Sequence, residues 1–160
     1  MKPMKPVLIV GLGNALMGDD AIGIVVAERL AADPRLPDTA EAVPGGTDLL
    51  RLASEIEDRT HVLVIDAFQD TAADPGSLVA IDPDSDTFDN RQPYAHHLSA
   101  LAAIQLLRLT TRVPFTLFGI AISSASAGTE LSPPLAARLP AILNHILNQI
   151  ETLPAPSHVL

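Results

Sequence analysis

The sequence predicts an α/β protein: a three-layer α/β/α sandwich with a mainly parallel five-stranded sheet. Short apolar runs, such as Val7–Val10 and His61–Phe68, have the composition of strands that are buried on both faces, as the strands of parallel sheets are. Segments with apolar residues at helical spacing separate these runs. Strands that alternate with helices along a chain are typical of a parallel sheet with helices on both faces.

The strands are expected in five segments. The first is expected to end at Gly11 and Gly13, where glycine lets the backbone turn sharply. The fourth is expected at an edge of the sheet. In chain order the predicted strands are Val7–Val10, Thr39–Val43, His61–Phe68, Gly76–Ile81 and Pro114–Ile122.

The helices are expected between these strands and after the last of them. The second is predicted to begin with Thr47 as its N-cap, and Pro140 is expected to kink or split the last one. An acidic loop, Asp82–Pro93, is expected to be mobile, and Ser123–Thr129 is expected to be a loop of small residues. The predicted helices are Ala21–Ala32, Thr47–Glu57, Tyr94–Leu109 and Ser132–Glu151.

Composition and charge limit the classes of function. We expect one domain over residues 1–152 and a disordered tail over 153–160, with no signal peptide and no membrane span. A net charge of −9, from 10 Lys and Arg against 19 Asp and Glu, argues against nucleic acid and anionic membranes as partners. The absence of cysteine excludes a thiol nucleophile, an iron–sulfur site and disulfides, and it fits a cytoplasmic protein. We expect the protein to be a monomer.

Two adjacent carboxylates, Asp19 and Asp20, stand between the first strand and the first helix. One of them is explained as a helix cap that accepts bonds from free backbone N–H groups. A dinucleotide-binding fingerprint is excluded, because Leu16 stands in place of the third glycine and two carboxylates would repel a pyrophosphate. The remaining interpretation is a metal or proton-transfer site, in which one Asp caps the helix and the other points into a cleft.

Polar residues also follow the other predicted strands. Gly45 and Gly46 follow the second strand and Asp66 ends the third, while His96 and His97 open a helix. Proteins with open parallel sheets bind ligands beyond the carboxyl ends of their strands. Two carboxylates and one histidine at that edge would form a ligand set for a divalent metal, although bonding of Asp66 to loop amides explains that residue equally well. The two histidines lie about 100° apart on a helix, so spacing alone does not choose between them.

Other catalytic signatures are absent from the chain. It contains no Gly-x-Ser-x-Gly elbow and no His-Glu-x-x-His zinc helix. A P-loop is excluded because Asp19 follows Gly18 where a lysine would be required.

Four motifs follow one another along the chain: Gly-Leu-Gly-Asn-x-Leu-x-x-Asp-Asp (Gly11–Asp20), Gly-Gly-Thr (Gly45–Thr47), Ile-Asp-Ala (Ile65–Ala67) and His-x-Leu (His96–Leu98). Together they resemble the motifs of the hydrogenase maturation endopeptidases, in the same order and spacing over roughly residues 7–150. The chain departs from the family pattern at Ala21, at Ala95 and over residues 121–126.

The resemblance implies an endopeptidase that removes the C-terminal extension from the large-subunit precursor of a nickel–iron hydrogenase, after nickel has been inserted. Nickel is expected to arrive with the precursor and not to be held by the free protein. The alternatives are a non-catalytic, nickel-checking chaperone of the same precursor and a small-molecule hydrolase on the same fold.

The resemblance also assigns the site residues. The catalytic and metal-contacting residues that it implies are Asp20, Asp66 and His96. The residues expected to flank the substrate chain are Gly45, Gly46 and Thr47.

Overall fold

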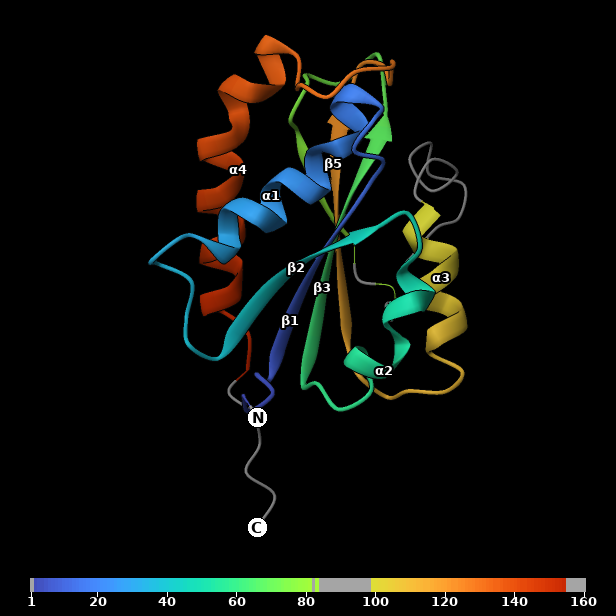
Figure 1. Cartoon of the computed structure of the whole chain (residues 1–160), viewed down its shortest axis with the longest axis vertical. Helices are drawn as coiled ribbons and strands as arrows, with labels where there is room; N and C mark the ends of the chain where they lie inside the picture. Colours follow the sequence, from blue (N-terminus) through green and yellow to red (C-terminus); the bar gives the residue numbers. More distant parts are fainter. Residues whose placement is uncertain (1, 82, 84–98, 155–160) are drawn as a thin grey trace.

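The computed structural model describes residues 2–81, 83 and 99–154, which contain a five-stranded sheet between two layers of helices (Figure 1). The strand order is β2-β1-β3-β5-β4, and only the edge strand β4 runs antiparallel to its neighbour. The predicted, mainly parallel sheet is therefore confirmed, as is the edge position of the fourth strand. The strands are β1 (Val7–Leu12), β2 (Ala40–Gly46), β3 (His61–Gln69), β4 (Leu78–Ile81) and β5 (Phe115–Ile122).

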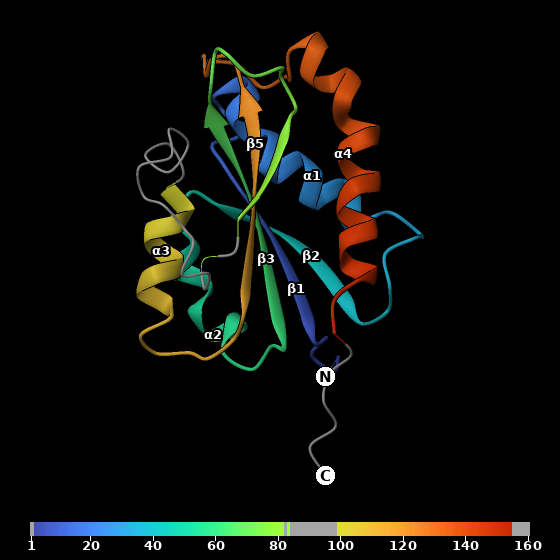
Figure 2. The same ribbon diagram turned by 180° about the vertical axis from the view of Figure 1, so that it is seen from behind.

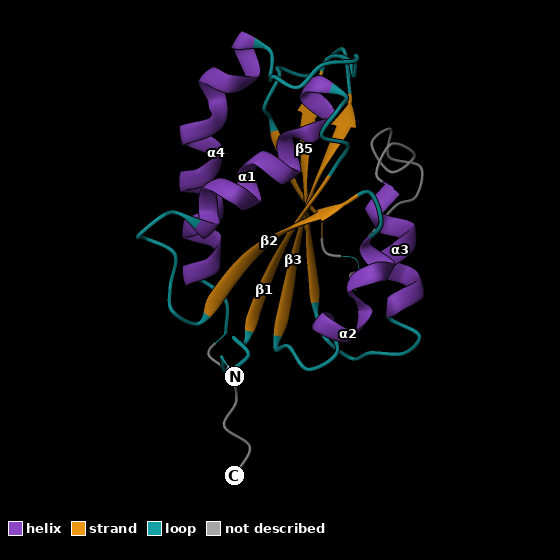
Figure 3. Ribbon diagram, in the orientation of Figure 1, coloured by secondary structure: helices purple, strands orange, loops and turns teal. Residues whose placement is uncertain are grey.

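The helices cover both faces of the sheet, which confirms the three-layer prediction (Figures 1–3). Helices α1 and α4 lie on one face, and α2 and α3 lie on the other. Two 3-10 turns, η1 and η2, lead directly into α1 and α2. The helical elements are η1 (Gly18–Ala21), α1 (Ile22–Ala31), η2 (Leu49–Leu52), α2 (Ala53–Ile56), α3 (Ser99–Leu107) and α4 (Pro133–Glu151).

The core has two halves because successive side chains of a strand point to opposite faces of the sheet. On β3, Ile65 packs in the cluster that contains α1 and α4, whereas Val64 packs in the cluster that contains α2 and α3. All residues of β1 are buried, as expected for a central strand covered on both sides.

Strands β1 and β2 run further than predicted. The turn after β1 begins after Leu12, because Gly11 remains in the strand and serves close packing: a Cβ at Gly11 would lie 1.9 Å from the carbonyl oxygen of Gly23 on α1. Strand β2 continues past its predicted end at Val43 through Gly46. Gly11, which suggested a turn, and Gly45 and Gly46, which were expected to follow the second strand, are therefore strand residues.

The predicted N-cap at Thr47 is wrong. Because β2 extends to Gly46, the helical segment begins later, and the side chain of Asp48 caps it by accepting a bond of 3.0 Å from the Leu50 backbone N–H. The segment then ends at Ile56, close to the predicted Glu57.

The other helix predictions are confirmed to different extents. Helix α1 agrees with its predicted range to within one residue at each end, and Pro140 lies inside a single continuous α4, so it does not split that helix. Helix α3 ends at Leu107, two residues before its predicted end at Leu109. Residues 94–98, nearly all of the predicted acidic loop at 82–93, and residues 155–160 of the predicted tail lie outside the described residues.

Leu153, which was assigned to that tail, packs against the core cluster of α1 and α4. No helix in the described part of the chain is long and apolar enough to cross a membrane.

Candidate functional site

The loop after β1 is fastened to the end of β2. The backbone N–H of Gly13 donates to the carbonyl oxygen of Gly46 at 2.9 Å. Gly46 has a φ of 64°, a conformation that side-chain-bearing residues rarely adopt. At Gly13, a Cβ would lie 2.2 Å from the carbonyl oxygen of Asp20. These two glycines therefore allow the turn that carries Asp20 to lie directly against the end of the sheet.

Asp20 turns its carboxylate back toward this loop. The side chain is half-buried, and its Oδ2 accepts a bond of 2.9 Å from the backbone N–H of Asn14. No hydrogen bond from the described residues reaches its Oδ1. One oxygen thus fixes the side chain, and the other has no hydrogen-bond partner within the described part of the chain.

Asp66 lies inside β3, which corrects the prediction that it ends the strand or lies past the sheet edge. The strand continues to Gln69, and Asp66 pairs with Gly119 of β5. On the opposite side, the pairing of β3 with β1 stops one residue earlier, at Gly11 and Ile65. Asp66 therefore sits where β1 leaves the sheet, with only 4% of its surface exposed.

The orientation of Asp66 follows from the alternation of side chains along β3. It shares a face with Val64 and Phe68, which pack in the cluster that contains α3. Its Oδ1 accepts a bond of 2.9 Å from the backbone N–H of Ala67. The carboxylate therefore faces the layer in which the chain enters α3.

The elements that carry the two carboxylates are in contact, because η1 lies against β3. The chain passes from β1 to β2, which pairs with one edge of β1, and then to β3, which pairs with the other edge of β1. The strand order therefore reverses at β1. Open α/β proteins bind ligands beyond the carboxyl ends of their strands at such a reversal of strand order. Asp20 and Asp66 both belong to elements at this reversal.

The prediction that one Asp of the pair caps its own helix is wrong. Neither η1 nor α1 has a side-chain cap. Instead, Asp19 holds the start of α4: its Oδ1 accepts a bond of 2.6 Å from the backbone N–H of Ser132, and its Oδ2 accepts one of 2.7 Å from the Ser132 hydroxyl. Sequence reasoning missed Ser132 because its partner lies 113 residues away.

A second link joins the same two loops. Gly18 donates to the carbonyl oxygen of Gly128, and Gly128 donates to that of Leu16, both at 2.9 Å. Met17 and Gly128 form an isolated parallel bridge. The loop after β5, which we expected to be made of small residues, thus supports the loop that carries Asp20.

The predicted substrate-flanking residues lie at the end of β2. Gly46 and Thr47 are exposed, and Gly45 is half-buried. A Cβ on Gly45 would lie 2.5 Å from Val10 Cγ1, whereas a Cβ on Gly46 would meet nothing within 4 Å. The space beside Gly46 is therefore open.

His96, the third predicted ligand, lies outside the described residues, three positions before the first residue of α3. Within residues 2–81, 83 and 99–154, no group of three or more His, Asp or Glu side chains is placed to hold a metal ion. Two histidines in this part of the chain make structural contacts. His61 Nε2 lies 2.9 Å from Thr116 Oγ1, and the His145 ring meets Phe118 edge-on at 6.2 Å between centroids.

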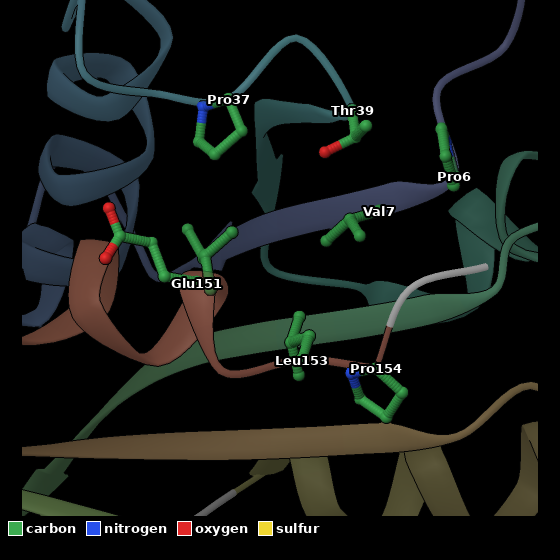
Figure 4. Close-up of a pocket in the computed structure, with 8 residues that line it drawn as sticks. Pro6, Val7, Pro37, Thr39, Glu151, Leu153 and Pro154 are labelled. Carbon is green, nitrogen blue, oxygen red and sulfur yellow. The ribbon is translucent and has the colours of Figure 1, made fainter.

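A pocket of about 280 Å³ lies at the opposite end of the sheet (Figure 4). It is formed where β1 begins and α4 ends, by residues such as Val7 and Glu151. It therefore does not contain the predicted site residues. The lining residues are Pro6, Val7, Pro37, Thr39, Ile150, Glu151, Leu153 and Pro154.

Comparison with known proteins gives consistent matches. A family model described as hydrogenase maturation protease matches residues 24–149, a range that includes Asp66 and begins after Asp20. The hydrogenase 2 maturation protease of Escherichia coli is 28% identical over 144 residues, which cover 88% of each chain.

Solved structures agree with this match. The hydrogenase maturating endopeptidase HybD from E. coli superposes with a TM-score of 0.70 at 27% identity, over 91% of both chains. The nickel–iron hydrogenase maturation protease HybD from Thermococcus kodakarensis superposes with a TM-score of 0.73 at 26% identity, over 89% of this chain and 97% of that chain.

Proposed function

Because the chain belongs to the hydrogenase maturation proteases, and so to the hydrolases that cut peptide bonds, we propose that it removes the C-terminal extension from the large-subunit precursor of a nickel–iron hydrogenase. The observation that carries this proposal is the family match, together with two carboxylates on contacting elements at the point where the strand order reverses. A protease that acts on one defined segment needs a site that fixes this segment over its reactive groups.

We propose that Asp20, Asp66 and His96 contact the nickel ion that the precursor carries. Asp20 Oδ1, which accepts no hydrogen bond from the described residues, supports this role. Two carboxylates and one imidazole leave positions open around a divalent metal, so the substrate can supply the remaining contacts. Without a thiolate, the set is a weak nickel site by itself, which makes nickel binding depend on the precursor.

We assign to Asp20, Asp66 and His96 the task of placing the scissile peptide bond of the substrate beside the metal. A divalent metal at this position can polarise the peptide carbonyl or lower the pKa of an attacking water, and both routes lead to hydrolysis. Gly45, Gly46 and Thr47 are assigned to the substrate chain, because the open space beside Gly46 allows a peptide backbone to approach closely.

The test compares nickel-loaded with nickel-free precursor. We expect only the loaded form to lose mass at its C-terminus when mixed with this protein. Metal analysis of the isolated protein is expected to find no stoichiometric metal, since the proposed site is completed by the substrate. Stoichiometric metal together with equal cutting of both precursors would indicate an autonomous metallopeptidase. Stable binding of the loaded precursor without any mass loss would indicate a chaperone.

A matched pair of substitutions tests the third ligand. His96→Ala is expected to abolish processing, whereas His97→Ala is expected to retain most of it, because adjacent side chains on the helix predicted from sequence for residues 94–109 would point about 100° apart. Cleavage of loaded precursor and a melting curve are measured for both variants. Loss of activity in His97→Ala alone would mean that the ligand has been assigned to the wrong histidine of the pair.

A further inference from the structure

Leu16 presents an apolar side chain to solvent from a loop whose backbone is fixed. The side chain is 67% exposed. Its own N–H donates to Asn14 Oδ1 at 3.0 Å, and its carbonyl oxygen accepts from Gly128 at 2.9 Å. The backbone of the next residue, Met17, is held in the same way by the Asn14 carbonyl and the Gly128 bridge.

This exposure is not explained by folding. An apolar side chain stabilises a fold in proportion to the surface that it removes from water, and Leu16 removes little. The loop also needs no leucine for its geometry, because all bonds of Leu16 are made by backbone atoms. What the leucine adds at this position is a rigidly held apolar group on the surface.

Leu16 borders the candidate site. It lies two residues after Asn14, whose backbone N–H holds the Asp20 carboxylate. The neighbouring segment, residues 123–130, is exposed along its whole length, and all but one of its side chains are small. No large neighbour in that segment covers Leu16, and the surface of another protein can approach it closely.

We propose that Leu16 is an apolar anchor for the folded body of the precursor, received by an apolar hollow next to the segment that is cut. This inference rests on the proposed function. Leu16 lies in the loop whose Asn14 N–H holds the Asp20 carboxylate, so the anchor is next to the proposed cleavage site along the chain. Because the loop is already fixed, little conformational freedom is lost when Leu16 is buried, and the burial contributes to affinity and to the register of the scissile bond.

The test uses two exposed leucines at opposite ends of the sheet. Leu109 is 79% exposed and lies between the end of α3 and the start of β5, away from the carboxyl edge. We expect Leu16→Ala to raise KM for nickel-loaded precursor about 10-fold or more, with kcat within about twofold of wild type. Leu109→Ala is expected to leave both unchanged, and Leu16→Met, which restores apolar bulk, is expected to recover most of the affinity.

The melting temperatures of Leu16→Ala and wild type are expected to agree, since little surface is buried by this side chain. An unchanged KM in Leu16→Ala, or a fall in kcat alone, would overturn the anchor. If the wild-type protein does not cut loaded precursor at all, the proposed function fails, and calorimetric titration of precursor into wild type and Leu16→Ala still decides the anchor. A weaker affinity of the variant would support it, and equal affinities would overturn it.

Discussion

Replacing Asp20 by asparagine is expected to abolish processing of the nickel-loaded precursor while leaving the fold in place. Asparagine has the same shape, and its amide oxygen can accept the bond from the Asn14 backbone that Asp20 Oδ2 accepts now. The substitution removes the negative charge and turns the second ligand atom into a donor. Loss of outer-shell groups typically costs about 10–100-fold in metal affinity or activity, and loss of a direct ligand is expected to cost more.

Cleavage is measured as loss of C-terminal mass, alongside thermal unfolding. Asp19→Ala is the matched control, because Asp19 is adjacent and equally acidic but bonds to Ser132. We expect Asp19→Ala to lower the free energy of unfolding by about 1–3 kcal/mol, since it leaves two donors without their charged partner, and to retain more processing than Asp20→Asn. Full activity of Asp20→Asn would refute the ligand assignment, and greater loss at Asp19 would exchange the two roles.

Asp66→Asn is expected to be equally severe. Asp66 is almost completely buried, and one of its oxygens already accepts the Ala67 N–H, a bond that an asparagine oxygen can also accept. Under the proposed function Asp66 contacts the nickel of the precursor, so the neutral variant loses its attraction to that positive charge.

Asp70→Asn provides the control for Asp66. Asp70 lies just after β3 and also accepts a backbone bond, from Ala72 at 2.9 Å, but it is more exposed. We expect Asp70→Asn to process the precursor at close to the wild-type rate. Processing by Asp66→Asn at that same rate would show that the carboxylate of Asp66 has a structural role only.

The strands and layers could be predicted from sequence because their signals are local. A run such as Val62–Ile65 fixes a buried strand, and the alternation of such runs with helices fixes a parallel sheet. The ends of strands were predicted less well. Gly11 was read as a turn residue and Gly46 was expected to follow its strand, yet both lie in strands. At Gly11 the glycine serves the close approach of two backbones, a use that a sequence does not distinguish from a turn.

The site was predicted in part, because some of its signals are local too. Asp20 and Asp66 stood out as carboxylates next to buried strands, and the structure brings the elements that carry them into contact. Their shared role with His96 stays a prediction. The role of Asp19 could not be inferred from the residues next to it in the sequence, because it depends on Ser132. No periodicity or spacing links residues so far apart.

The bond between Asp19 and Ser132 also has a consequence for the order in which the protein becomes active. Because a ribosome makes the chain from its amino end, Asp19 emerges 113 residues before its partner. The turn that carries Asp20 lacks this support until synthesis has passed Ser132, and contacts between residues so distant in the sequence form late and slowly. An unfinished chain therefore does not hold Asp20 as the complete protein does, even though its first strand and both carboxylates have already been synthesised.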